Sequence, residues 1–433
     1  MAASGLVSAA VAIISQLQSL DSESEDDDLL LECAISAVEA EANSSSGENS
    51  KSVEKVKGYV EYTVPRYRSK DFQEHFRLNR TTADILMSKL APLFNKNQNS
   101  RGRCPLTVEK KVLCSLYLLS NQAPFRCLSV KIPKFDKPLN PKQPHTITEP
   151  TTLLTVEKLH LSFLIPYQLA ADRFNICRRT AWKILHEFSS ALLDLNKREG
   201  IISWPNQEQA FKTSQYYTKK FGFPGVIGVV DGKHMAIKAP RNDHSSYYNR
   251  KQFYSIILQA VCNEKLLFTD CYVGEAGSVH DACVYRRSTL AKRIDEGVGF
   301  PVDTHLLGDA AYPLNKYLLT PYRDNGHLTE IQSYFNTKLS KCRSSIERAF
   351  GLFVGRFRRF KLLDMHRLDL MVMLIMAGCI LHNFSILEGD ETNIEEERLV
   401  GVPEVIENVQ ARRDAQNKRS DLANILFARR IQH

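Results

Sequence analysis

The sequence lacks the marks of a secreted or membrane-embedded protein. Its ten cysteines include no Cys-x-x-Cys pair and no secretory signal precedes them, so we expect reduced thiols in the cytosol or nucleus. The apolar run at residues 5–20 is short, contains serine and glutamine, and follows no basic residue, which argues against a membrane segment. We therefore expect a protein without a membrane partner.

Basic residues are absent from positions 1–50, which hold ten acids. The remaining residues carry 57 basic and 39 acidic side chains, a net charge of +18. A hydrophobic content of 43% is close to that of ordinary soluble proteins and excludes collagen-like and wholly disordered chains. A basic body of this charge indicates a polyanionic partner, most often nucleic acid.

Composition and periodicity divide the chain into four parts. Residues 1–58 are predicted to be an acidic disordered tail because the runs DSESEDDD and NSSSGENS contain too little apolar surface to fold. Residues 59–200 are predicted to be a small helical domain, with threonine-capped helices at 81–90 and 107–119. Residues 201–388 alternate strands and helices, and residues 389–433 are predicted to be a polar or helical tail.

The end of the helical part has the layout of a helix-turn-helix. A short helix at 169–175 is followed by a break at Ile176 and Cys177, and a second helix begins with Arg178 and Arg179. In a helix-turn-helix the second helix enters the major groove, so these arginines are candidate DNA contacts. An ordinary helical hairpin with surface arginines is the alternative.

Residues 127–168 interrupt this helical pattern. Six of the 17 prolines fall there, with almost no periodicity. A loop of this length is unusual within a compact domain. We interpret the segment as an atypical insert, either a lineage-specific insertion or a translated intron.

Four acids lie at predicted element ends in the α/β region. Strands are predicted at 226–230, 254–261, 266–273 and 306–308, and helices at 281–293, 344–357 and 368–387. The acids are Asp231, Asp281, Asp309 and Glu347. Each has a structural alternative: a turn at Asp231, a cap at Asp281, a strand end at Asp309, and an ion pair of Glu347 with Arg343. Together they indicate a metal site, because clustered carboxylates ionise at neutral pH mainly when Mg²⁺ or Mn²⁺ neutralises them.

Six motifs in order carry a resemblance to a known family. They are GFPGVIGVVDGKH, YYNRKQFYSIILQAVCN, GEAGSVHDACVYRRS, LLGDAAYP, RSSIERAFGLFVGRFRRF and CILHN. The chain resembles the PIF/Harbinger transposase superfamily and, within it, the transposase-derived nucleases. The resemblance implies a ribonuclease H-like α/β fold and a DDE endonuclease with two divalent cations. Asp231, Asp309 and Glu347 match the acid triad, and Asp281 matches a fourth acid associated with the metal site.

Basic residues flank these acids. Arg250, Lys251, Arg286 and Arg343 are the candidate DNA contacts, since cations near a cleavage site position phosphates without reading sequence. Arg356, Arg358 and Arg359 follow Glu347 and add to the positive charge.

The sequence supports two hypotheses of function. The first is a nuclear, metal-dependent DNA endonuclease of transposase origin. The second is a domesticated, catalytically silent DNA-binding or adaptor protein. The resemblance also implies a Myb/SANT-like partner, self-association and a nuclear location, with the cytoplasm as the alternative compartment.

Overall fold

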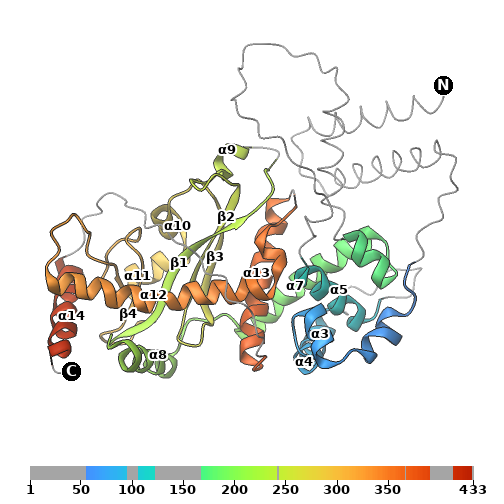
Figure 1. The fold of residues 1–433 in the computed structure, drawn as a ribbon, viewed down its shortest axis with the longest axis horizontal. Coiled ribbons are helices and arrows are strands. Elements are labelled where there is room, and N and C mark those ends of the chain that lie inside the picture. Colours follow the sequence, from blue (N-terminus) through green and yellow to red (C-terminus); the bar gives the residue numbers. More distant parts are fainter. Residues whose placement is uncertain are drawn as a thin grey trace, which may run out of the picture. The chain divides into compact units, whose positions relative to one another are not determined.

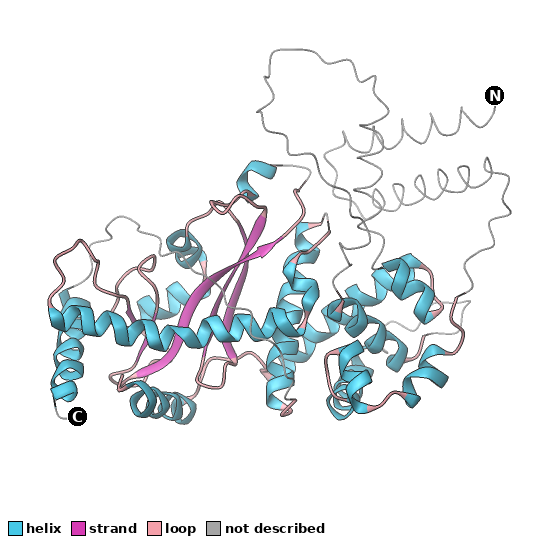
Figure 2. Ribbon diagram, viewed as in Figure 1, coloured by secondary structure: helices cyan, strands magenta, loops and turns pink. Residues whose placement is uncertain are grey.

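The computed structural model describes residues 55–94, 106–121, 167–240, 243–365, 367–390 and 413–431. Most of the predicted acidic tail and of the 127–168 insert lie outside these ranges, as does part of the 389–433 tail. A mixed sheet lies at the centre of the region from residue 201, with helices packed around it (Figure 2).

The sheet has five strands in the order β3-β2-β1-β4-β5. β1, β2 and β3 are antiparallel neighbours, whereas β4 is parallel to both β1 and β5. The strands are β1 Val226–Ala236, β2 Ser255–Cys262, β3 Phe268–Ala276, β4 His305–Leu307 and β5 Leu318–Leu319. Every residue of β2 is buried, which explains its nearly continuous apolar run. This mixed sheet is consistent with the ribonuclease H-like fold that the resemblance implies.

The predicted end of the first strand is wrong. β1 does not stop at Val230 but continues to Ala236, because β2 pairs along this whole stretch. Asp231 pairs with Ala260 inside the ladder, so the turn interpretation of Asp231 is also wrong. Pairing with a long neighbouring strand overrides the local turn preference of an Asp-Gly step.

Helices cover both faces of the sheet (Figure 1). α12 (Glu330–Arg356) and α13 (Leu368–Leu387) share a core with Val229 and Met235 of β1. α10 (Asp281–Arg287) and α11 (Thr289–Glu296) share the other core with Val230. Alternate residues of β1 thus face opposite helix layers, as the pleat of a strand requires.

Two predicted helix boundaries differ from the structure. The predicted helix at 281–293 is two helices, because Ser288 ends α10 and caps α11 with its hydroxyl. The predicted helix at 344–357 is only the second half of α12, which begins after a capping box at Thr329. Glu347 therefore lies within a helix rather than near its start.

α13 connects the sheet region with the N-terminal helices. It contacts β3 on one side and α7 (Arg178–Glu199) on the other. It is the one helix of the described ranges long and apolar enough to cross a membrane, but 72% of its apolar window is buried inside the protein. Its bounds match the predicted core helix, and His382 is buried as expected, with Nε2 2.9 Å from the carbonyl oxygen of Leu266.

The N-terminal helices include α3 (Ser69–Phe76), α4 (Arg80–Phe94) and α5 (Val108–Ser120), and Thr107 caps α5 as predicted. Of these, α4 and α5 pack on α7, and α3 packs on α4 and α5. A helix at 167–174 and a three-residue connection precede α7, where the sequence predicted a short helix, a break and a second helix. The remaining elements are a π-helical turn Tyr59–Thr63, 3-10 turns Val64–Arg66 and Arg358–Lys361, α8 Gln207–Phe221, α9 His244–Tyr247 and α14 Arg413–Ile431.

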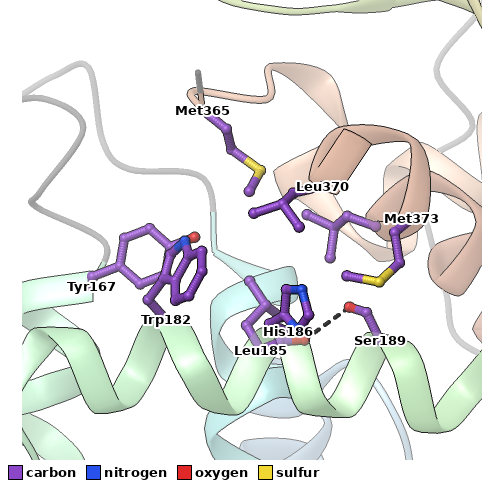
Figure 3. Close-up of a pocket in the computed structure, with 9 residues that line it drawn as sticks. Tyr167, Trp182, Leu185, His186, Ser189, Met365, Leu370 and Met373 are labelled. Carbon is purple, nitrogen blue, oxygen red and sulfur yellow. Dashed lines mark hydrogen bonds between the residues drawn. The ribbon is translucent and has the colours of Figure 1, made fainter. Parts of the chain in front are cut away.

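A mainly apolar pocket lies between α7 and α13 (Figure 3). Its lining residues are Tyr167, Trp182, Leu185, His186, Ser189, Met365, Leu370, Met373 and Leu374. The α7 side chains in it recur at helical spacing, so this face of α7 is turned toward α13. None of the predicted site residues lines this pocket.

Candidate active site

The parallel pairing of β1 and β4 brings Asp231 and Asp309 to the same level. Val229 pairs with Leu307, and each aspartate lies two residues farther along its chain. β4 ends at Leu307, whereas β1 continues to Ala236. The loop that carries Asp309 therefore follows β4 beside the second half of β1. Backbone amides orient both carboxylates: Asp231 accepts from the Gly232 N–H at 2.9 Å and Asp309 from the Ala311 N–H at 2.9 Å.

Arg343 lies among the acids. Its Nη2 donates to Asp231 Oδ2 at 3.0 Å, and the two side chains are only 20% and 18% exposed. Burial by itself lowers the pKa of the Arg343 guanidinium, but the charges of Asp231, Asp309 and Glu347 raise it above its usual value. One guanidinium from α12 therefore interacts with all three members of the predicted triad.

Glu347 lies one helical turn beyond Arg343 and shares its side of α12. Burial raises the pKa of the Glu347 carboxyl, Arg343 lowers it, and Asp231 raises it, with a net upward shift. The influence of Asp231 on Glu347 places these two carboxylates in one electrostatic cluster. Arg343 forms its ion pair with Asp231, whereas the structural alternative paired it with Glu347.

Asp281 approaches the cluster from the opposite face of the sheet. It is the first residue of α10, and a Cβ atom at Gly232 would lie 2.7 Å from its Oδ1. A side chain at position 232 would therefore force this carboxylate to shift away from the strand. Since Gly232 follows Asp231 directly, the four acids gather around one edge of β1 from both faces.

Two further polar residues of this region were missed by the sequence analysis. Tyr312 is 3% exposed, and its hydroxyl has no hydrogen-bond partner among the described residues. Burial and then the charges of Asp281, Asp231 and Asp309 raise its pKa well above the usual value. Gln259 pairs with Gly232, lies on the same face as Asp281, and likewise has two buried polar atoms without a partner in the described part of the chain.

Their sequence signals were present but not decisive. Tyr312 follows Asp309 within LLGDAAYP, and Gln259 is the polar residue of the otherwise apolar run SIILQAVC.

Replacing Tyr312 with phenylalanine should leave the protein as stable as wild type or raise its free energy of unfolding by up to about 1 kcal/mol. The reason is that a buried hydroxyl without a partner costs free energy of desolvation that no hydrogen bond offsets. Urea unfolding of both proteins in EDTA measures the difference. A clear loss of stability in Tyr312→Phe would show that the hydroxyl forms a hydrogen bond in the folded protein.

The donor set fits a hard divalent cation. Four carboxylates and no thiolate are the ligands that Mg²⁺ and Mn²⁺ prefer, and the partnerless Tyr312 hydroxyl shows that polar groups are buried beside them. Within the described ranges, however, no three Asp, Glu, His or Cys side chains form a group able to hold a metal. The Arg343 guanidinium supplies the positive charge that these acids require.

The predicted DNA-contact residues divide into three groups. Arg250, Lys251 and Arg286 are exposed, and Arg250 lies 2.7 Å from the ring nitrogens of His280, the residue before Asp281. Arg343 is inside the acid cluster. Arg178 and Arg179 begin α7, which α13 separates from the sheet (Figure 1).

Two basic residues expected to surround Glu347 at the surface are buried. Arg356 is 6% exposed and pairs with Asp390, and Arg359 is 2% exposed. The sequence pattern could not show this, because the partner that allows Arg356 to be buried lies beyond the next helix.

Comparison with known proteins finds sequence similarity over the region that holds the four acids. Residues 230–383 match the DDE superfamily endonuclease model, a range that includes all four acids. "Putative nuclease HARBI1" of Rattus norvegicus is 31% identical over 228 residues, covering 50% of this chain and 62% of that protein. The human protein of the same name is 31% identical over 229 residues, with the same coverage. "Protein ALP1-like" of Arabidopsis thaliana is 27% identical over 209 residues, covering 44% of this chain and 50% of the relative.

The matched region spans less than two thirds of these relatives. No solved structure matches the chain. Residues 230–383 are thus similar to the DDE superfamily endonuclease model, and the chain is similar in sequence to the HARBI1 and ALP1-like proteins.

Proposed function

We propose that the chain is a divalent-metal-dependent endonuclease of transposase origin that hydrolyses phosphodiester bonds of DNA. The observation that carries this proposal is that Asp231 of β1, Asp309 of the loop after β4 and Glu347 of α12 all act on Arg343, while Asp281 of α10 lies beside Gly232 on the other face of β1. Four acids at one edge repel one another, so this arrangement is unfavourable unless positive charge is supplied there. A reaction that requires bound divalent cations would explain why the four acids are kept together.

The residues have distinct roles in this proposal. Asp231, Asp309 and Glu347 would hold two Mg²⁺ or Mn²⁺ ions, with Asp281 as an additional carboxylate. The bound cations would activate water or a hydroxyl and stabilise the leaving oxygen. At the exposed rim, Arg250, Lys251 and Arg286 would hold the phosphates on either side of the scissile bond.

The proposal extends to partners and location. DNA is the proposed substrate, supported by the +18 charge of residues 51–433. Arg178 and Arg179 at the start of α7 would add contacts outside the catalytic domain. A Myb/SANT-like partner, self-association and a nuclear location complete the proposal and follow from the resemblance alone.

Cleavage of supercoiled plasmid by the purified full chain tests the proposed function. We expect nicked or linear DNA with Mg²⁺ or Mn²⁺ and none with EDTA. A gel-shift assay in EDTA records DNA binding in parallel. DNA binding without cleavage under both metals would contradict the endonuclease and favour the silent DNA-binding or adaptor alternative.

A further inference from the structure

We propose that Arg343 competes with the divalent cation for Asp231 and thereby couples cation binding to DNA binding. This inference rests on the proposed function. It assigns to Arg343 a role different from that of a simple surface contact to DNA. In the cation-free protein the Arg343 guanidinium binds Asp231. In the protein with bound cation and DNA, the guanidinium would instead bind a phosphate of the DNA.

The position of Arg343 supports the competition. Its Nη2 contacts Asp231 at 3.0 Å, and Asp309 and Glu347 act on the same guanidinium. These are the three carboxylates that would hold the cations. The same carboxylates would bind either the guanidinium or the divalent cations. Because both together would place excess positive charge at one position, binding of one occupant excludes the other.

A second arginine of the same helix shows what a purely structural pair looks like. Arg356 donates to the Asp390 carboxylate at 3.2 Å, to the Arg77 carbonyl oxygen at 3.1 Å and to the Asp390 carbonyl oxygen at 2.6 Å. It is 6% exposed, and none of its nitrogens is left buried without a partner in the described residues.

Arg343 is held much less completely. It makes one hydrogen bond to Asp231, and its Nε is buried without a partner in the described part of the chain. Its side chain keeps 20% of its surface exposed. A guanidinium that makes few hydrogen bonds and is partly exposed can leave its carboxylate at lower cost than one whose donors are all satisfied.

The phosphodiester backbone is the ligand that fits the displaced side chain. A guanidinium binds phosphate oxygens through two parallel N–H donors, and Arg343 lies beside the acids where the scissile phosphate would be held. Cation binding would make the guanidinium available to DNA, and DNA would stabilise it away from Asp231. By linkage, each ligand then tightens the binding of the other by the same factor.

Mn²⁺ titration of the full chain, followed by electron paramagnetic resonance, tests this coupling. Wild type and Arg343→Gln are titrated with and without a short DNA duplex that is checked for cleavage afterwards. We expect Arg343→Gln to bind Mn²⁺ about tenfold more tightly than wild type without DNA, within the usual range of coupling between sites. We also expect DNA to tighten Mn²⁺ binding by wild type and to have little effect on the variant.

Two variants serve as controls. Arg343→Lys keeps the positive charge and should bind Mn²⁺ nearly as wild type does. Arg287→Gln removes an exposed arginine of α10 that pairs with Glu275 of β3, and it should leave Mn²⁺ affinity and its response to DNA unchanged.

Equal Mn²⁺ affinity in wild type and folded Arg343→Gln would overturn the proposal. If that variant does not fold, wild type alone decides: an Mn²⁺ affinity that DNA leaves unchanged also overturns it. Failure of the proposed function is separate, since it would appear as Mn²⁺ binding with the expected Arg343 effect but without plasmid cleavage.

Discussion

Replacing Asp231 with asparagine is expected to lower DNA cleavage by about 10³-fold or more while DNA binding in EDTA is retained. Asparagine keeps the size of the side chain, and its Oδ1 can still accept from the Gly232 N–H, while its NH₂ group replaces the Oδ2 that accepts from Arg343. What it removes is the negative charge that a divalent cation requires. The fold and the exposed basic rim should therefore survive while the chemistry is lost.

Plasmid cleavage and gel shift on the same preparations measure the two effects. Glu296→Gln is the matched control, because Glu296 is an exposed acid at the end of α11 and its loss changes the net charge equally. Asp231→Asn that cuts as fast as Glu296→Gln would show that the active site has been assigned wrongly. Loss of DNA binding in Asp231→Asn would instead show a role in binding.

Replacing Asp390 with alanine is expected to lower the free energy of unfolding by about 3–5 kcal/mol, the cost of breaking a buried ion pair. The Asp390 side chain is fully buried and pairs with Arg356, whose side chain is 7% exposed. Asp390 also accepts from the Asn79 N–H at 2.7 Å and from the Gln73 side chain at 3.4 Å. The variant leaves the Arg356 charge buried and breaks contacts between the end of α13 and the N-terminal helices.

Urea unfolding of full-length proteins in EDTA measures this loss. Asp369→Ala is the control, because Asp369 pairs with Arg367 at 2.6 Å but its side chain is 56% exposed. An exposed pair of this kind contributes less than about 1 kcal/mol. Similar losses in the two variants would show that the Asp390 network does not hold the helical and sheet regions together.

Local sequence signals predicted the elements whose ends depend on their own residues. Thr107 caps α5 through its side chain, and α13 has the predicted bounds because its apolar run is long and uninterrupted by a break. Asp309 was expected just after a strand and lies two residues past β4. In each case the deciding interaction is within a few residues along the chain.

The missed helix boundaries at Ser288 and Thr329 depend on local caps, but the other features that were not predicted depend on partners far away in the sequence. Asp231 was expected at the end of a strand, with a turn as the alternative, but β2 extends β1 through it. The Arg343–Asp231 hydrogen bond joins residues 112 positions apart, and the contact of Asp390 with Asn79 joins residues 311 apart. Charge patterns cannot reveal such pairs, so Arg356 was counted with the surface cations.

Mn²⁺ binding by the four acid variants tests the central claim most directly, because it asks whether these carboxylates form one cation site. Wild type is compared with Asp231→Asn, Asp281→Asn, Asp309→Asn and Glu347→Gln in the absence of DNA. We expect a saturable site in wild type that is weakened at least about tenfold by each substitution. Unchanged Mn²⁺ binding across the four variants would contradict the metal-dependent active site.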